Sequence, residues 1–299
     1  MLKKVRFILE YLPVLGLINL VRLIPASSLA SIAGKLAGLW HALDKKRKNI
    51  ARRNILKAMP DQFNEKNVDE LVRQIFTEVA ITILEIIRHV QTNDRKWIDE
   101  NIEIQGGEHI ENALKGGKGI LFFTPHFGNW ELTSLKVGLQ FQKVYSVYRP
   151  LDNFYLDRLI HESRSQYNQE MFPKKGAVRS LLKALKKGEC VGLLVDQHVS
   201  PYQEGIWVNF FNRKAATSPI IAELHKRTEA PVLPVFCVRQ PDGKYVIEIQ
   251  EELVMDEGED QIEKNTQKIN DVMEAKIREH PEHWFWIHRR WKTSPDEKS

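Results

Sequence analysis

The stretch that most constrains the fold is Thr124–Glu131, with the sequence TPHFGNWE. It follows a short apolar run over residues 118–123, which predicts a buried strand. It precedes residues 132–139, which predict a helix. We therefore expect His126 in a turn at the end of a strand and Glu131 in the first turn of a helix. This succession of elements favours an α/β fold.

The positions of His126 and Glu131 predict a general base with a carboxylate partner. Residues five apart on one continuous helix point about 140° away from each other, so the two side chains meet easily only if His126 precedes the helix. Pro125 and Gly128 break regular structure, and Asn129 is a good N-cap residue. Glu131 then lies near the second helical position, where the helix dipole favours an ionised carboxylate. Such a carboxylate fixes the tautomer of an imidazole that deprotonates a substrate hydroxyl.

A structural interpretation of the same two residues stays open at this point. A histidine after a strand often serves only as a hydrogen-bonding group, and a glutamate at the start of a helix is commoner still. The motif itself contains no serine or cysteine nucleophile. The residues alone therefore leave both interpretations standing.

The composition fits one large α/β domain with an appended N-terminal segment. The chain has 299 residues, 42% of them hydrophobic, and can bury a sizeable core without disulfides. Its two cysteines, Cys190 and Cys237, lie in apolar runs and are expected to be buried, reduced and not catalytic. No Cys/His cluster has zinc spacing, so we expect neither a metal nor a cofactor. The net charge of +5 fits a membrane surface or a phosphorylated substrate, and no motif indicates a nucleic-acid partner.

Residues 1–25 are expected to form a helical membrane-anchoring segment, and residues 26–299 the catalytic domain. The segment begins with basic residues and then becomes apolar, but Glu10, Pro13 and Arg22 interrupt the run. A spanning helix needs about 20 nearly uncharged residues, so a helix lying in the interface or a poorly hydrophobic anchor fits better. A core helix of a soluble protein is the alternative.

The rest of the chain alternates predicted strands and helices, which indicates a mostly parallel central sheet flanked by helices. Strands are expected at residues 101–106, 143–149, 190–195, 231–238 and 244–249, and helices at 26–43, 63–93, 107–115, 152–170, 177–187, 219–228 and 259–280.

Further polar residues stand where a binding site is expected. Asp196 and Gln197 follow the strand at 190–195, at the end where α/β sheets place ligand-binding groups, although Asp196 also fits a turn cap. Arg149 ends one strand, and Arg164 lies in the predicted helix 152–170. Arginine suits phosphate binding, and a surface ion pair is the alternative.

The fuller pattern resembles a known family, the late acyltransferases of lipid A biosynthesis of the lauroyl/myristoyl type. The match lies in HFGNWE, which has the form His, four residues, then an acid, and in YRP at 148–150. It continues in the aromatic and small residues of 210–218 and in WIHRRWK at 286–292, which contains Arg289 and Arg290. Asn212 stands where a glycine is usual after the aromatics in the family that this pattern resembles.

The resemblance implies transfer of an acyl chain from acyl carrier protein to a hydroxyl of a lipid A precursor. The enzyme would work at the bacterial inner membrane with its catalytic domain facing the cytoplasm, and without an acyl-enzyme. His126 would be the base and Glu131 would hold it. Arg149 and Arg164 would bind phosphates or stabilise charge, and Asp196 would orient an arginine or the acceptor.

The remaining candidates are expected to bind substrate or stabilise charge. These are Asn129, Gln197, Arg289 and Arg290, and the oxyanion would take a hydrogen bond from a backbone N–H near Gly128 or from an arginine. For Arg289 and Arg290, packing against the neighbouring aromatics is the alternative.

Other functions stay open. The acceptor could be another glycolipid, such as a phosphatidylinositol mannoside, or the donor acyl-CoA. A thioesterase would use His126 to activate water. A non-catalytic peripheral membrane-binding protein would use only the N-terminal segment and the basic run at residues 45–48.

Overall fold

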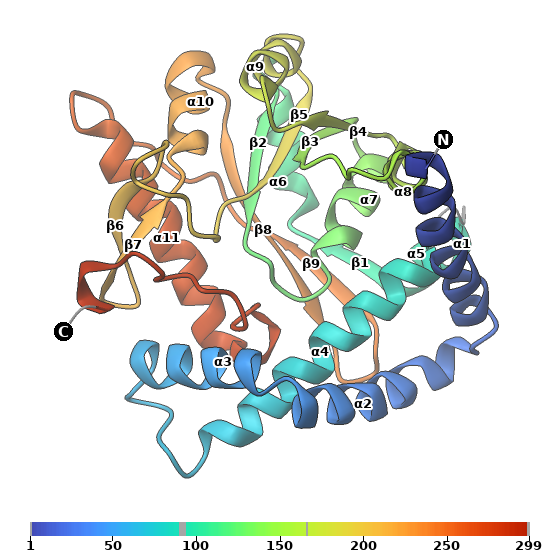
Figure 1. The fold of residues 1–299 in the computed structure, drawn as a ribbon. Helices are drawn as coiled ribbons and strands as arrows, with labels where there is room; N and C mark the ends of the chain where they lie inside the picture. The colour runs from blue at the N-terminus through green and yellow to red at the C-terminus, as the bar shows by residue number, and fades with distance from the viewer. Residues whose placement is uncertain (1, 90–93, 166, 298–299) are drawn as a thin grey trace.

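The computed structural model describes residues 2–89, 94–165 and 167–297, so the end of the predicted helix 63–93 lies partly outside the described residues. Its centre is a seven-stranded sheet with the order β1-β9-β8-β2-β5-β3-β4 (Figure 1). The pair β8–β9 is antiparallel and the other neighbouring pairs are parallel. The strands are β1 (Ile102–Gln105), β2 (Ile120–Thr124), β3 (Val144–Tyr148), β4 (Gln169–Pro173), β5 (Cys190–Leu194), β8 (Val232–Arg239) and β9 (Tyr245–Ile249).

Helices flank this sheet, which confirms the predicted α/β class. They are α1 (Leu2–Arg22), α2 (Ala26–Leu43), α3 (Lys45–Ala58), α4 (Val68–His89), α5 (Arg95–Asn101), α6 (Gly107–Leu114), α7 (Trp130–Gln140), α8 (Phe154–Ser165), α9 (Ala177–Lys186), α10 (Ile220–Thr228) and α11 (Gln261–Glu279), with two 3₁₀ turns, η1 (Pro281–His283) and η2 (Pro295–Glu297).

The alternation of side chains along β2 divides the interior into two cores, because successive residues of a strand point to opposite faces of the sheet. Leu121 and Phe123 face the larger core, which α4, α9, α10 and α11 complete. Ile120 and Phe122 face the smaller core, which α5, α6 and α7 complete. Every one of these four side chains is at most 5% exposed. Packing on both faces therefore fixes β2 up to the start of the loop that contains His126.

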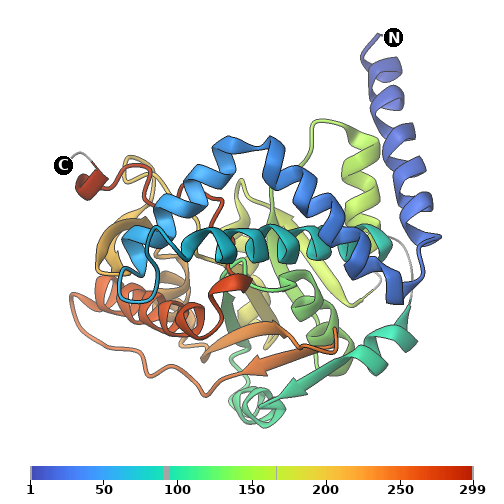
Figure 2. The same ribbon diagram turned by 90° about the horizontal axis from the view of Figure 1, so that it is seen from below.

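The N-terminal helices form a layer of their own. Figures 1 and 2 show α2, α3 and α4 side by side across one side of the sheet, with α1 standing beside α8. Within the described part of the chain, no helix is both long and apolar enough to cross a bilayer.

Two elements differ from the predicted ones. The helix predicted at 152–170 ends at Ser165, and β4 follows it; Asn168, with a φ of 57°, turns the chain between them. The basic run at 45–48 begins α3, whose start is capped because the Asp44 side chain accepts the Arg47 backbone N–H at 3.0 Å.

A small hairpin, β6 (Ile206–Phe210) and β7 (Arg213–Thr217), forms a second sheet where no strands were predicted. The two residues of its turn, Phe211 and Asn212, both have a φ of 54°. Two positive φ values are typical of the tight turns that match the twist of paired strands. Asn212 suits this position because asparagine tolerates a positive φ better than most other side chains do.

Candidate active site

The candidate site lies at the carboxyl ends of two neighbouring parallel strands. Thr124, the last residue of β2, pairs with Leu194, the last residue of β5. His126 and Asp196 each follow two residues after their strand, so the same register brings them together. Nδ1 of His126 lies 2.7 Å from Oδ1 of Asp196. The register of β2 and β5 therefore brings the two side chains together.

The environment of the pair shifts the pKa of both groups. Burial alone would lower the pKa of His126, but the charge and hydrogen bond of Asp196, with help from Glu131, outweigh burial and raise this pKa above its usual value. Burial acts to raise the pKa of Asp196, yet His126 and the indole N–H of Trp284 hold it at about 2. Trp284 Nε1 donates to Oδ2 of Asp196 at 2.8 Å. Asp196 is therefore a carboxylate whose two oxygens are both engaged, and the tautomer of His126 with its proton on Nδ1 is favoured.

The expectation that Glu131 holds His126 is wrong. Glu131 lies at the second position of α7, as predicted, but its two carboxylate oxygens accept Nε and Nη2 of Arg164 at 2.9 and 2.5 Å. Asp196 was expected to orient an arginine or the acceptor; its two carboxylate oxygens contact His126 and Trp284, and neither contacts an arginine in the part of the chain that the structure describes. Glu131 contributes to His126 through its charge and not through a hydrogen bond.

The second nitrogen of His126 faces the open side of the site. The Nε2 atom lies 3.3 Å from the amide nitrogen of Gln197, and the side chain of His126 remains 18% exposed. The rings of Trp130 and Phe285 lie 5.0 and 6.1 Å from the imidazole, measured between centroids. A hydroxyl group can thus approach Nε2 between the rings of Trp130 and Phe285. It would displace the amide group of Gln197 from Nε2.

Asn129 belongs to a buried polar network that supports the loop after β2. It was expected to bind substrate or stabilise charge, and the structure gives it a different role. This residue occupies the N-cap position of α7, but its side chain makes no capping hydrogen bond and is fully buried. Its Nδ2 donates instead to Oε2 of Glu85 at 2.8 Å, and the Tyr245 hydroxyl donates to the same oxygen at 2.5 Å. Asn129 is therefore a support of the loop and cannot contact substrate.

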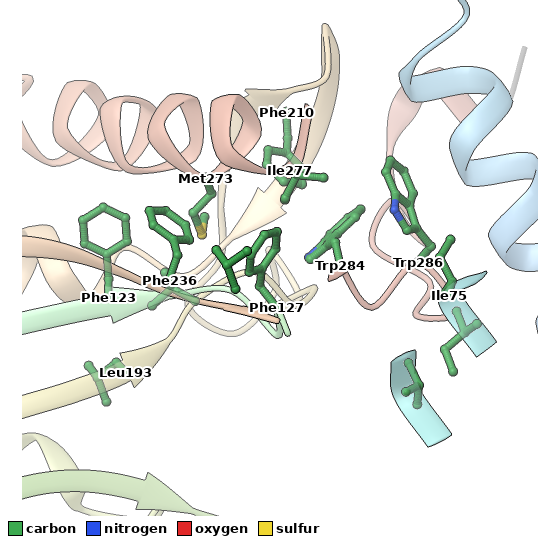
Figure 3. Close-up of a cluster of buried hydrophobic side chains, with 14 of the residues drawn as sticks. Ile75, Phe123, Phe127, Leu193, Phe210, Phe236, Met273, Ile277, Trp284 and Trp286 are labelled. Atoms are coloured by element: carbon green, nitrogen blue, oxygen red, sulfur yellow. The ribbon is translucent and has the colours of Figure 1, made fainter. Parts of the chain in front are cut away.

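The segment after α11 holds the loop in place through two backbone hydrogen bonds. The backbone N–H of Phe285 donates to the carbonyl of His126 at 3.1 Å, and the N–H of Gly128 donates to the carbonyl of His283 at 2.9 Å. The N–H of Gly128 is therefore occupied, which removes it as the oxyanion donor. Figure 3 shows Phe127 of the loop packed among Phe236 and residues of α11, with Trp284 beside it.

The arginines predicted near the C-terminus separate into two kinds. Arg290 is 1% exposed, and it donates to the Ala216 carbonyl at 2.7 Å and to the Thr217 hydroxyl. Burial lowers its pKa to about 10, and its guanidinium lies over the ring of Phe210. Arg290 is therefore a packing residue, and its predicted contact with substrate is wrong. Arg289 is exposed, and so is Arg149 after β3.

Arg289 lines a pocket of about 490 Å³ next to the loop that contains His126. Phe285, whose ring neighbours His126, forms part of its wall, and Lys292 adds a second positive charge. Burial lowers the pKa of His288, also in this wall, to about 4, so this imidazole is neutral at neutral pH. The remaining lining residues are Ile50, His198, Ser200, Gln203 and Ile287.

Several residues of the site were not predicted. Trp284 contacts Asp196 across 88 residues of sequence, and Glu85 supports the loop from α4 across 44 residues. A glutamate within the apolar face of a helix is unusual, and it indicates a buried hydrogen-bond partner. Trp284 carried no comparable signal, because tryptophan in an aromatic segment is compatible with simple packing.

Comparison with known proteins agrees with this geometry. The sequence pattern of the family described as bacterial lipid A biosynthesis acyltransferase matches residues 2–293. The chain is 30% identical over 287 residues to the lipid A biosynthesis lauroyltransferase of Escherichia coli (strain K12), which covers 94% of this chain and 91% of the relative. It is 27% identical over 286 residues to the lipid A biosynthesis palmitoleoyltransferase of the same organism, covering 94% and 90%. A more distant relative is the phosphatidylinositol mannoside acyltransferase of Mycolicibacterium smegmatis, 24% identical over 277 residues and covering 91% and 88%.

Proposed function

Because the chain belongs to the bacterial lipid A biosynthesis acyltransferase family, we propose that it moves a fatty acyl chain from acyl carrier protein to a hydroxyl of a lipid A precursor. The reaction would be a late, secondary acylation on the cytoplasmic side of the inner membrane. The observation that carries the proposal is the His126–Asp196 pair, whose Nε2 faces the open side of a site built at the strand ends. No cofactor is needed for this chemistry.

In the proposed reaction His126 is the general base. Its Nδ1–H donates to Asp196, so Nε2 accepts the proton of the substrate hydroxyl while the oxygen attacks the thioester carbonyl. Asp196 stabilises the imidazolium that results, without taking the proton itself. Collapse of the tetrahedral intermediate breaks the carbon–sulfur bond, and the imidazolium returns its proton to the departing thiolate. Acyl transfer is then complete in a ternary complex, without an acyl-enzyme.

Charge stabilisation is assigned to the residues around Nε2. The amide of Gln197 lies 3.3 Å from Nε2, close to where a carbonyl oxygen under attack would become negative. Arg164, held by both oxygens of Glu131, supplies a fixed positive charge with a side chain that is 27% exposed. Arg149 and Arg289 are exposed at the rim and suit the phosphates of donor or acceptor.

The surface of α1 supports association with a membrane. Val5, Leu9, Leu12 and Leu20 recur at helical spacing, Leu23 follows the end of the helix, and each is at least 51% exposed. Such a stripe lies favourably in the apolar region of a bilayer surface, while the basic residues at its start meet anionic headgroups. We assign residues 1–25 to this anchoring role and residues 26–299 to catalysis.

A second acceptor class has one observation in its favour. The similarity to a phosphatidylinositol mannoside acyltransferase extends over 91% of the chain, so the fold and the site are compatible with a different glycolipid. The His126–Asp196 pair would serve either acceptor in the same way.

A transfer assay with mass-spectrometric detection separates these possibilities. Purified full-length protein in detergent is given acyl carrier proteins loaded with different chains, or the matching acyl-CoA, together with a tetra-acylated lipid A precursor or a phosphatidylinositol mannoside. The proposal predicts one added acyl mass on the lipid A precursor, with acyl carrier protein as donor. Transfer to the mannoside alone favours the second acceptor, and release of free fatty acid without an acceptor favours a thioesterase.

A further inference from the structure

A cluster of metal-ligating side chains lies behind the active site, in residues that the proposed acyl transfer does not use. His280 ends α11, and Glu282 and His283 belong to the 3₁₀ turn η1 that follows. One ligand atom of each residue lies within 4.8 Å of the other two. The sequence pattern did not reveal this group because one ligand is a glutamate and all three fall within four residues.

The distances within the cluster are those of a metal site and not of hydrogen bonds. Oε1 of Glu282 lies 3.6 Å from Nδ1 of His280 and 3.5 Å from Nε2 of His283. Both exceed the 2.7–3.2 Å of an ordinary N–H···O hydrogen bond. Two ligands bound tetrahedrally at about 2.0–2.1 Å are separated by about 3.3 Å, which is close to both of the distances to Glu282.

His283 has the environment of a histidine that binds a metal through Nε2. Its side chain is 4% exposed, and its Nδ1 atom makes no hydrogen bond although it is buried. Oε2 of Glu78 lies 3.8 Å from this Nδ1. Metal-bound histidines usually donate their other N–H to a carboxylate, which fixes the tautomer.

We propose that His280, Glu282 and His283 form a binding site for one divalent transition-metal ion of the zinc class. Two imidazoles and one carboxylate are a ligand set that zinc accepts, with a fourth position left for water. That position is accessible, because the three residues line a pocket of about 580 Å³. Glu78 would accept the Nδ1–H of His283 when Nε2 binds the metal. Nη1 of Arg239 lies 3.6 Å from the other carboxylate oxygen of Glu78 and balances the negative charge of Glu78.

The ion would stiffen the short segment after α11 that contacts the loop containing His126. The carbonyl of His283 accepts the N–H of Gly128 at 2.9 Å, and its ring contacts Phe127 edge-on at 5.4 Å between centroids. Trp284, the next residue, is the hydrogen-bond donor to Asp196. A metal that fixes His283 therefore fixes the segment that positions the catalytic pair.

The test is zinc binding to the full-length protein, without a polyhistidine tag and depleted of metal by a chelator. Calorimetric titration should show one zinc per chain, with magnesium showing none, and cobalt substitution should give the intense visible absorption of a tetrahedral site. Saturating zinc should raise Tm by about 5 °C, the scale expected at roughly a hundredfold over Kd. Acyl transfer is not needed for any of these readouts, so failure here leaves the proposed function untouched.

Matched variants give the experiment its specificity. Glu282→Gln and His280→Asn should abolish the stoichiometric site, and Glu78→Gln should weaken it by about tenfold, the effect of losing an outer partner. His109→Asn changes a histidine on α6, outside the cluster, and should bind zinc as the wild type does. Circular dichroism confirms that each variant is folded. No zinc bound by the folded wild type, or equal binding by wild type and Glu282→Gln, overturns the proposal.

Discussion

Oδ1 of Asp196 lies 2.7 Å from Nδ1 of His126, and the indole of Trp284 occupies the other carboxylate oxygen at 2.8 Å. The acid that holds the proposed base therefore comes from the neighbouring strand end and not from the motif that contains the histidine. Glu131, the acid of that motif, is paired with Arg164. The motif thus supplies a base and a charge-positioning group, and β5 supplies the partner of the base.

The first prediction concerns the pH dependence of transfer. Because Asp196 raises the pKa of His126, the wild-type rate should increase with pH through a midpoint above 6.5, the ordinary value. In Asp196→Asn most of the raising influence is lost and only the charge of Glu131 still opposes burial, so the midpoint should fall while kcat drops by about 10²-fold to 10⁴-fold. Measurement of kcat/KM between about pH 5 and pH 9 tests this. If the midpoint of the pH–rate profile is the same in Asp196→Asn as in the wild type, Asp196 does not set the pKa of the base.

The second prediction concerns Glu131 and Arg164. The pair is partly buried, with side chains 21% and 27% exposed, so removing either partner leaves the other without its counter-charge. Glu131→Gln and Arg164→Gln should each lower kcat/KM, and the double variant should be no worse than the poorer single variant. The coupling energy in this cycle should be about 2 kcal/mol. Strictly additive losses would mean that the two residues act independently.

Much of the site's framework was predictable from local patterns. The apolar run before His126 and the cap and helix after it placed the base at a strand end, and β2 and α7 confirm this. Both cysteines are buried, as their apolar context indicated. Local patterns could not pair His126 with Asp196, because that contact depends on β5 lying beside β2, a matter of strand order. They also could not show that Arg290 is buried, since aromatic neighbours suit packing and binding equally.

The third prediction concerns Asn54 of α3, which ties the C-terminal segment to the helical layer. Its Nδ2 donates to the carbonyls of Trp286 and His288, each at 2.9 Å, and the side chain is buried. Asn54→Leu should lower the free energy of unfolding by about 3 kcal/mol, because two hydrogen bonds are lost and one or more carbonyls are left buried without a partner. Asn112→Leu, on the exposed face of α6, should change it by less than about 0.5 kcal/mol. Urea unfolding measures both, and equal effects would contradict the assigned role.

The fourth prediction concerns the apolar stripe of α1. Leu9 and Leu20 are 65% and 62% exposed, and burying each in lipid contributes about 1.5 kcal/mol or more. The double variant Leu9→Glu/Leu20→Glu should therefore bind anionic lipid vesicles about a hundredfold more weakly in a sedimentation assay. The matched control Tyr202→Glu/Val254→Glu adds the same charge at residues that are 96% and 79% exposed elsewhere. Equal loss in both variants would show that net charge, and not this stripe, governs binding.

The most direct test of the central claim is single-turnover transfer to the lipid A precursor by wild type and by His126→Gln. Rapid quenching and mass spectrometry would follow both the acylated lipid and any acylated protein. The proposed mechanism predicts that the wild-type lipid gains one acyl chain with no acylated protein at any time, and that His126→Gln is slower by about 10²-fold or more. An acyl-enzyme that forms and decays at a competent rate, or transfer that survives His126→Gln, would contradict it.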